Sequence, residues 1–196
     1  METKVICITG GIGSGKSTLC ESLERRSFPV YYSDVRAKQL METDEGIISE
    51  LKELFSDQAY SNGQLNRSYL SQQIFSHPHL KAQLEAVVHP AVRNDFHTWL
   101  GEQNAPVVFK ESALAIETRD TSCDSIVSVV ADKQLRIARV LCRNTDWSLE
   151  QVLERMKHQI TDTERSKGSD YLVQNDGDSE DLEHQIDQLL SKLSVI

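Results

Sequence analysis

The stretch Thr9-Gly10-Gly11-Ile12-Gly13-Ser14-Gly15-Lys16-Ser17-Thr18 decides the fold. Residues Gly10 to Ser17 match the pattern G-x-x-x-x-G-K-[ST], which forms a phosphate-binding loop between a strand and a helix. Both neighbours are expected here, because Val5-Ile6-Cys7-Ile8 predicts a buried parallel strand and Lys16 to Arg26 predicts a helix. The glycines let backbone N–H groups approach a phosphate, and the positive end of the helix dipole adds to the attraction.

The same loop predicts how ATP and Mg²⁺ are bound. Lys16 is expected to reach the β- and γ-phosphates, and the Ser17 hydroxyl is expected to ligate Mg²⁺. The other loop residues expected at the nucleotide are Gly11, Gly13, Ser14, Gly15 and Thr18. The formal net charge of −9 does not oppose this, because aimed backbone amides produce their own local positive field.

Composition excludes several classes of protein. The 196 residues, 39% hydrophobic and 26% charged, are ordinary for a single globular domain. The sequence contains no lysine- or arginine-rich block of the kind that predicts nucleic-acid binding. No signal peptide and no apolar run near the roughly 20 residues of a membrane span occur. We therefore expect a cytoplasmic monomer or weak homo-oligomer.

The cysteines match no zinc or redox spacing, which predicts four reduced thiols: Cys7, Cys20, Cys123 and Cys142.

Strands and helices alternate along the rest of the chain. Further strands are predicted at Val30–Tyr32, Val107–Phe109, Ile126–Val130 and Tyr171–Val173. Helices are predicted at residues 134–143, 148–159 and 181–193. Residues 35–100 are mostly helical, with a turn at Ser61-Asn62-Gly63 and breaks at Pro78 and Pro90. This order predicts an α/β fold with a five-stranded parallel sheet and a helical insertion.

Two aspartates follow predicted strands. Asp34 comes just after the second strand, where open α/β sheets bind ligands, so it is a candidate to orient or deprotonate an acceptor hydroxyl. Spacing alone leaves open whether Asp34 instead caps the next helix. Asp132 follows the fourth strand, as the Mg²⁺ aspartate does in ATPases, but a helix cap is the commoner explanation.

The segment from Arg136 to Arg165 is locally basic within an acidic chain. Arg136, Arg139 and Arg143 are spaced to share helix faces, and Arg165 follows further along. Basic residues on a helical flap can close over phosphates and stabilise transferring charge. For any single arginine a solvated surface position is the simpler interpretation, and Arg143 and Arg165 are the two favoured as functional.

Taken in order, these features resemble the dephospho-coenzyme A kinase family. The matching positions are Thr9 to Thr18, Pro29-Val30, Asp34, Ala37-Lys38, Asn66-Arg67, Leu70, Ile74-Phe75, Leu84-Glu85, Val88 to Val92, Gln159, Arg165, Asp170, Asn175 and Gly177. The resemblance implies a three-layer P-loop kinase fold with a core (about 1–34, 105–142 and 169–196), a helical substrate-binding insertion (about 35–104) and a helical lid (about 143–168).

The resemblance also implies an activity and a set of site residues. The activity is Mg²⁺-assisted transfer of the ATP γ-phosphate to the ribose 3′-hydroxyl of dephospho-coenzyme A, the last step of coenzyme A synthesis. The implied catalytic residues are Asp34, Lys16 and Arg143, with Arg143 and Asn175 also at the nucleotide. The implied substrate-binding residues are Asp34, Lys38, His89 and Arg93.

Two positions depart from the family pattern. Many members carry Asp-x-Asp where this chain has Tyr32-Ser33-Asp34, so a carboxylate near the metal is missing. Ala113 stands where the family has proline, ahead of Glu117. The alternatives are another small-molecule kinase, such as a nucleoside monophosphate kinase, and a P-loop ATPase or switch that uses Asp132.

Overall fold

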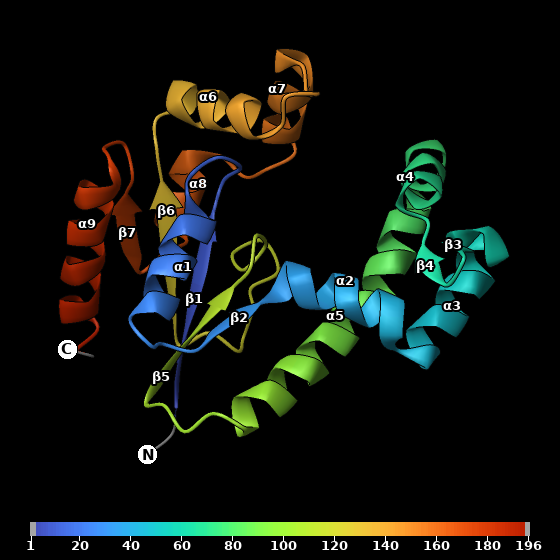
Figure 1. The fold of residues 1–196 in the computed structure, drawn as a ribbon, viewed down its shortest axis with the longest axis horizontal. Helices are drawn as coiled ribbons and strands as arrows, with labels where there is room; N and C mark the ends of the chain where they lie inside the picture. The colour runs from blue at the N-terminus through green and yellow to red at the C-terminus, as the bar shows by residue number, and fades with distance from the viewer. Residues whose placement is uncertain (1–2, 195–196) are drawn as a thin grey trace. The chain divides into compact units, whose positions relative to one another are not determined.

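A parallel sheet forms from the apolar runs of the sequence. The computed structural model describes residues 3–194. Across the sheet the strands are β2 (Val30–Tyr32), β5 (Val107–Glu111), β1 (Lys4–Gly10), β6 (Ser125–Val130) and β7 (Tyr171–Gln174) (Figure 1). β1 pairs in parallel with both β5 and β6, and β6 pairs in parallel with β7. This confirms the predicted five-stranded parallel sheet, with the strand before the glycine-rich loop at its centre.

Five helices from both halves of the chain belong to the same unit as this sheet, and the first and the last two of them contact its strands. They are α1 (Lys16–Arg25), α6 (Lys133–Arg143), α7 (Leu149–Lys157), α8 (Asp162–Lys167) and α9 (Ser179–Lys192). α1 and α9 are tied together by Glu183, which accepts hydrogen bonds from Ser22 Oγ at 2.7 Å and Arg26 Nη2 at 2.7 Å. Sheet and helices form one of two compact units, made of the chain up to residue 31 and from residue 103 onward.

Residues 32–102 form the second compact unit. Its elements are α2 (Ser33–Thr43), α3 (Glu45–Phe55), the 3₁₀ turn η1 (Asp57–Ala59), β3 (Tyr60–Ser61), β4 (Gln64–Leu65), α4 (Arg67–Ser76) and α5 (His79–Gly101). It has its own core, made of Ile47, Leu51, Phe55, Ala59 and Leu70. Arg36 on α2 binds Asp95 on α5, with Nε 2.8 Å from Oδ2, so the two helices are joined by an ion pair as well as by packing.

Three predictions about this second unit have different outcomes. The turn at Ser61-Asn62-Gly63 is confirmed, and it joins the short antiparallel strands β3 and β4. Pro78 precedes α5 as its N-cap, as expected for a break. The break predicted at Pro90 is wrong, because α5 continues through it for 23 residues. Proline removes one helical hydrogen bond, and burial of Val88 and Phe96 on either side holds the helix together.

Among residues 3–194, no helix is long and apolar enough to span a membrane.

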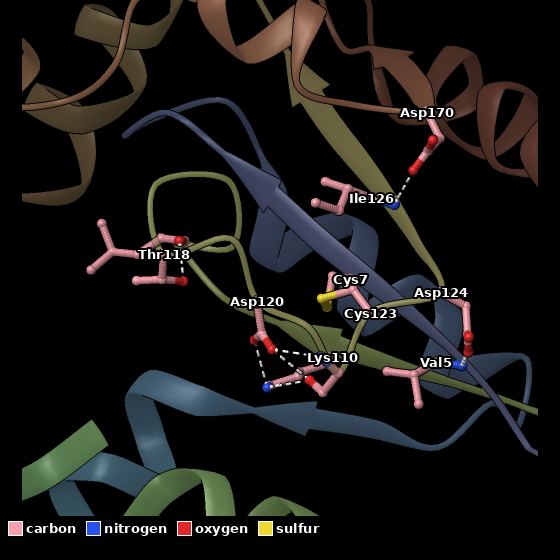
Figure 2. The surroundings of a disulfide bond; sticks show 11 residues. Val5, Cys7, Lys110, Thr118, Asp120, Cys123, Asp124, Ile126 and Asp170 are labelled. Atoms are coloured by element: carbon pink, nitrogen blue, oxygen red, sulfur yellow. Dashed lines mark hydrogen bonds and ion pairs between the residues drawn. A yellow bond between two sulfur atoms is a disulfide. The ribbon is translucent and has the colours of Figure 1, made fainter. Parts of the chain in front are cut away.

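A disulfide joins β1 to the loop before β6. Cys7 and Cys123 are bonded (Figure 2), so the prediction of four reduced thiols is wrong for this pair. They are 116 residues apart in sequence, but the pairing of β1 with β6 brings their Cα atoms to 5.5 Å, a usual separation for a disulfide. Cys20 and Cys142 are free thiols. Burial raises the pKa of Cys20 to about 12, which makes its thiol unreactive.

Removing the disulfide is expected to destabilise the sheet unit. Cys123→Ser should lower the free energy of unfolding by about 2–5 kcal/mol, because the bond closes a long loop in the unfolded chain. Thermal unfolding with and without a thiol reductant measures this. Cys142→Ser is the matched control, since Cys142 is exposed and unbonded. Finding four alkylatable thiols in the denatured, unreduced protein would contradict the bond.

Candidate functional site

The loop between β1 and α1 has the backbone of a phosphate-binding turn. Gly13 and Gly15 have φ angles of 78° and 96°, in the left-handed region that favours glycine. The Ser14 N–H donates to the Gly11 carbonyl at 3.0 Å and closes the turn. α1 begins at Lys16 with no side-chain cap, so its first backbone N–H groups are available to an anion.

Lys16 forms an ion pair with Glu111, the last residue of β5. Both side chains are largely buried, with 14% and 7% of their surface exposed. Glu111 reaches this place because β5 pairs with β1 in a register that sets Glu111 beside Ile8. A buried carboxylate therefore meets the ammonium group that is expected to bind the β- and γ-phosphates. Glu111 was not among the residues predicted from the sequence, because only the pairing of the two strands brings it to Lys16.

Lys110, the neighbour of Glu111, holds the loop that follows β5. Its Nζ donates to Asp120 Oδ2 at 2.7 Å and to Ser122 Oγ at 2.9 Å (Figure 2). Burial alone raises the pKa of Asp120, but the hydrogen bonds from Lys110 and Ser122 outweigh it and the pKa is lowered. Asp120 also lies close to the sulfurs of Cys7 and Cys123, but both sulfurs are already used by the disulfide.

Asn175 braces the phosphate-binding loop from the end of β7. Its Nδ2 donates to the Ser14 carbonyl at 2.7 Å, and its own carbonyl accepts from Arg139 Nη1 at 2.9 Å. A Cβ at position 15 would collide with this Asn175 amide, so Gly15 is required by space as well as by its φ angle. The side chain of Asn175 thus fixes the shape of the loop.

Arg136 and Gln159 both hold the backbone of Ile12 in this loop. Arg136 Nε donates to the Ile12 carbonyl at 3.0 Å, and the Ile12 N–H donates to Gln159 Oε1 at 3.0 Å. Arg136 Nη1 also binds Asp162 Oδ1 at 2.7 Å. Arg136 is only 5% exposed, so the interpretation of the α6 arginines as solvated is wrong for this residue. Its one sequence signal is the helix face that it shares with Arg139.

The remaining predicted nucleotide residues lie at helix ends. Ser17 and Thr18 are exposed in the first turn of α1. Arg143 is exposed in the last turn of α6, and no side-chain hydrogen bond or ion pair holds it within residues 3–194. Asp132 caps α6 by accepting from Gln134 N and Leu135 N. The helix-cap interpretation of Asp132 is therefore confirmed.

The predicted acceptor-side residues belong to the unit of residues 32–102. Asp34 is exposed in the first turn of α2. The N-cap of α2 is Tyr32, without a side-chain cap bond, so the alternative that Asp34 caps this helix is wrong. The others are also exposed: Lys38 on α2, and His89 and Arg93 on α5. No hydrogen bond or ion pair engages any of these four side chains in the described part of the chain, so all four are available to a ligand.

The sheet order and this loop define a class of protein. A parallel α/β sheet that carries a glycine-rich loop and its lysine after the central strand is the nucleotide-binding core of the P-loop proteins, which include kinases, ATPases and GTPases. The sequence profile of one such family, dephospho-CoA kinase, matches residues 4–181. This chain belongs to the dephospho-CoA kinase family.

Curated relatives agree with this assignment, and solved structures share the fold. The chain is 35% identical over 175 residues to a dephospho-CoA kinase of Bacteroides fragilis, covering 88% of this chain and 85% of that one. It is 35% identical over 187 residues to one of Salinibacter ruber, covering 93% and 94%. A crystal structure from Thermus thermophilus superimposes with a TM-score of 0.87 at 36% identity, over 98% of this chain and 99% of that one. The fold of a Campylobacter jejuni dephospho-CoA kinase matches with a TM-score of 0.68 at 21% identity, over 97% and 96%.

Proposed function

We propose that this chain transfers the γ-phosphate of ATP to the ribose 3′-hydroxyl of dephospho-CoA and releases CoA and ADP. The observation that supports it most directly is the phosphate-binding loop, with Lys16 at the start of α1, in a chain of the dephospho-CoA kinase family. In this proposal Lys16 leaves Glu111 and binds the β- and γ-phosphates when ATP enters. The backbone N–H groups from Gly11 to Thr18 bind the remaining phosphate oxygens.

The proposal divides the other predicted residues between the two substrates. Asp34 accepts the proton of the acceptor hydroxyl, because an exposed carboxylate without a partner is available to act as a general base. Arg143 neutralises charge on the transferring phosphate. Asn175 acts at the nucleotide through its hydrogen bond to the Ser14 carbonyl. Lys38, His89 and Arg93 bind dephospho-CoA, whose phosphates suit the two cationic residues among them.

Mg²⁺ fits the oxygen donors around Lys16. The Ser17 hydroxyl at the start of α1 and the Glu111 carboxylate at the end of β5 are hard oxygen ligands of the kind Mg²⁺ prefers. When bound with ATP, the ion neutralises charge on the β- and γ-phosphates. In this proposal Glu111 supplies the carboxylate that is missing at Tyr32, directly or through a water molecule.

Glu111→Gln is expected to weaken the Mg²⁺ dependence of ATP binding. The ratio of the ATP dissociation constants without and with Mg²⁺ should fall by about tenfold, a typical coupling between two ligands. The glutamine removes a negative charge that repels free ATP and attracts the metal. Calorimetric titrations with ATP in EDTA and in Mg²⁺ measure the ratio. Glu21→Gln, an exposed change on α1, is the control, and an unchanged ratio in Glu111→Gln would exclude Glu111 from the metal site.

The acceptor is tested by ADP release with purified enzyme. Turnover with ATP and dephospho-CoA is expected, with no turnover in the absence of an acceptor. Turnover with a nucleoside monophosphate but not with dephospho-CoA would replace the proposal by a nucleoside monophosphate kinase. Hydrolysis that needs no acceptor and collapses in Asp132→Asn would instead support an ATPase, although Asp132 caps α6 in this structure.

We also propose that the chain works in the cytoplasm as a monomer or weak homo-oligomer, without nucleic acid. A net charge of −9 opposes binding to polyanions except where a local site is built for them. In a reducing compartment the Cys7–Cys123 bond persists only if the small thiols that reduce disulfides react with it slowly. Cys7 is fully buried, which restricts attack on that sulfur.

A further inference from the structure

Two side chains hold carbonyl groups of the phosphate-binding loop. Arg136 Nε, on α6, donates to the Ile12 carbonyl at 3.0 Å. Asn175 Nδ2, just after β7, donates to the Ser14 carbonyl at 2.7 Å. Both side chains are buried. Two peptide groups of the loop are therefore fixed by residues that come from distant parts of the chain.

The direction of each carbonyl decides the direction of the next N–H group. In a planar trans peptide, the C=O of one residue and the N–H of the next point to opposite sides. Because the Ile12 carbonyl points to Arg136, the Gly13 N–H points away from Arg136. The Gly15 N–H likewise points away from Asn175. Neither N–H has an acceptor in the described part of the chain, so both are available to an anion.

The N–H groups between these two are bonded within the protein. The Ile12 N–H donates to Gln159 Oε1 at 3.0 Å, and the Ser14 N–H donates to the Gly11 carbonyl at 3.0 Å. Along residues 12–15 the N–H groups therefore alternate, one used by the fold and the next left for a ligand.

Arg136 acts on this loop through its position rather than through its charge. A Cβ placed at position 11 would lie 2.5 Å from Arg136 Nη2, so the guanidinium lies directly against the backbone of Gly11. Arg136 Nη1 binds Asp162 at 2.7 Å, which balances the charge. Asp162 is the first residue of α8, which also carries the buried Arg165. Because the two bonds leave from different nitrogens of one planar group, they fix the guanidinium.

We propose that Arg136 is a positioning residue, which turns the Gly13 N–H toward the phosphates of the bound nucleotide without touching them itself. The inference rests on the nucleotide-binding part of the proposed function and is independent of the acceptor. Arg136 Nε keeps the Ile12 carbonyl turned away from the ligand, so the Gly13 N–H is already aimed when ATP arrives. A donor that is ordered before binding saves the free energy of ordering it during binding.

Arg136→Met should raise the ATP dissociation constant about tenfold, the size of one hydrogen bond to a charged group. Methionine keeps much of the volume but cannot donate to the Ile12 carbonyl. Isothermal titration of the full chain with ATP and Mg²⁺ measures the constant. Lys157→Met is the matched control, because Lys157 is an exposed cation on α7 whose ion pair with Glu154 lies at the surface, and its ATP affinity should equal that of wild type. Wild-type affinity in Arg136→Met would overturn the proposal.

The Gly13 amide gives a readout that separates positioning from general support of the loop. In ¹⁵N-labelled wild type, saturating ATP and Mg²⁺ should move the Gly13 amide proton downfield, because it donates to a phosphate oxygen. This movement should shrink in Arg136→Met, whereas the movement at Gly15, whose peptide Asn175 still holds, should remain. Equal losses at Gly13 and Gly15 would mean that Arg136 supports the loop as a whole, which would overturn the proposal.

Asp162→Asn tests which bond of Arg136 matters. It breaks the ion pair and leaves the hydrogen bond to Ile12. Because 56% of the Asp162 side chain is exposed, the ATP dissociation constant should stay within about threefold of wild type. A loss as large as that of Arg136→Met would mean that the link to α8 carries the effect, against the proposal.

Arg136→Lys covers the case in which Arg136→Met does not fold. Lysine keeps the charge, but its only nitrogen lies one atom beyond the place of Nε, on the side of Asp162. The Ile12 carbonyl therefore loses its donor, and ATP should bind several-fold more weakly with a smaller Gly13 response. Wild-type values of both quantities, or failure of both Arg136 variants to fold, would overturn the proposal.

Dephospho-CoA is absent from all of these titrations. A wrong acceptor assignment would therefore leave their result unchanged, whereas a wild-type chain that binds no ATP would remove the proposed function itself.

Discussion

Lys16→Ala is expected to reduce kcat by about 10²–10³, the size of effect seen when one preorganised charge or donor is removed from a transition state. Lys16 lies at the N-terminus of α1 beside the glycine-rich loop, where the β- and γ-phosphates are expected. During transfer, negative charge develops on the oxygens of the moving phosphoryl group. An ammonium aimed at those oxygens stabilises the transition state more than the ground state, so kcat should fall more than ATP affinity does.

The same substitution should also destabilise the protein. Lys16 and Glu111 are an ion pair with 14% and 7% of their side chains exposed. Removing one partner leaves Glu111 charged and buried, which typically costs about 3–5 kcal/mol. Loss of activity in Lys16→Ala alone would therefore mix a catalytic effect with a folding effect.

The double variant Lys16→Ala/Glu111→Gln separates these two effects. It removes both charges, so its unfolding temperature should recover most of the loss. Its turnover should stay low, because the cation at the phosphates is still absent and the Glu111 carboxylate proposed for Mg²⁺ is removed as well. Thermal unfolding and steady-state kinetics at saturating ATP measure the two quantities. If the double variant recovers turnover together with stability, Lys16 acts only through the fold.

Sequence patterns predicted the parts of the site that are local in the chain. The loop from Gly10 to Ser17 is predictable because all the residues that define it are close together in the sequence. They are the glycines, two of which have positive φ, and the lysine and hydroxyl that follow them. The strand before it and the helix after it follow from hydrophobic pattern alone. The cap at Asp132 was also a local expectation, and the structure confirms it.

Contacts between distant parts of the chain were not predictable in this way. Glu111 meets Lys16, and Asn175 meets Ser14, only because β5 and β7 take particular places in the sheet. The Cys7–Cys123 bond depends on the same pairing of strands. The spacing of the cysteines in the sequence fits no zinc or redox motif, so the sequence alone predicts free thiols.

Local rules also failed where packing overrides them. Pro90 predicts a helix break, yet buried residues on both sides of it keep α5 continuous. Arg136 has the sequence environment of a surface residue but lies buried against the loop. In both cases the tertiary environment outweighs a preference of about 1–3 kcal/mol.

Asp34→Asn is expected to reduce kcat by about 10²–10⁴, the usual contribution of a general base. Asparagine keeps the size and shape of the side chain but cannot accept a proton from the acceptor hydroxyl. Asp34 is exposed and forms no cap bond at the start of α2. The fold should therefore lose only the small favourable interaction of a carboxylate with the helix dipole, about 0.3–1 kcal/mol.

Binding and chemistry should separate in this variant. ATP contacts are expected at the loop of residues 11–18, and Asp34 lies outside it, so the ATP dissociation constant should stay within about twofold of wild type while turnover with dephospho-CoA collapses. Asp57→Asn is the matched control, because Asp57 is also an exposed acid in the first turn of a helical segment in residues 32–102. Its turnover should be normal. Since a base that takes up the hydroxyl proton cannot be replaced by an amide, near-normal kcat in Asp34→Asn would mean that another group, or the phosphate itself, accepts that proton.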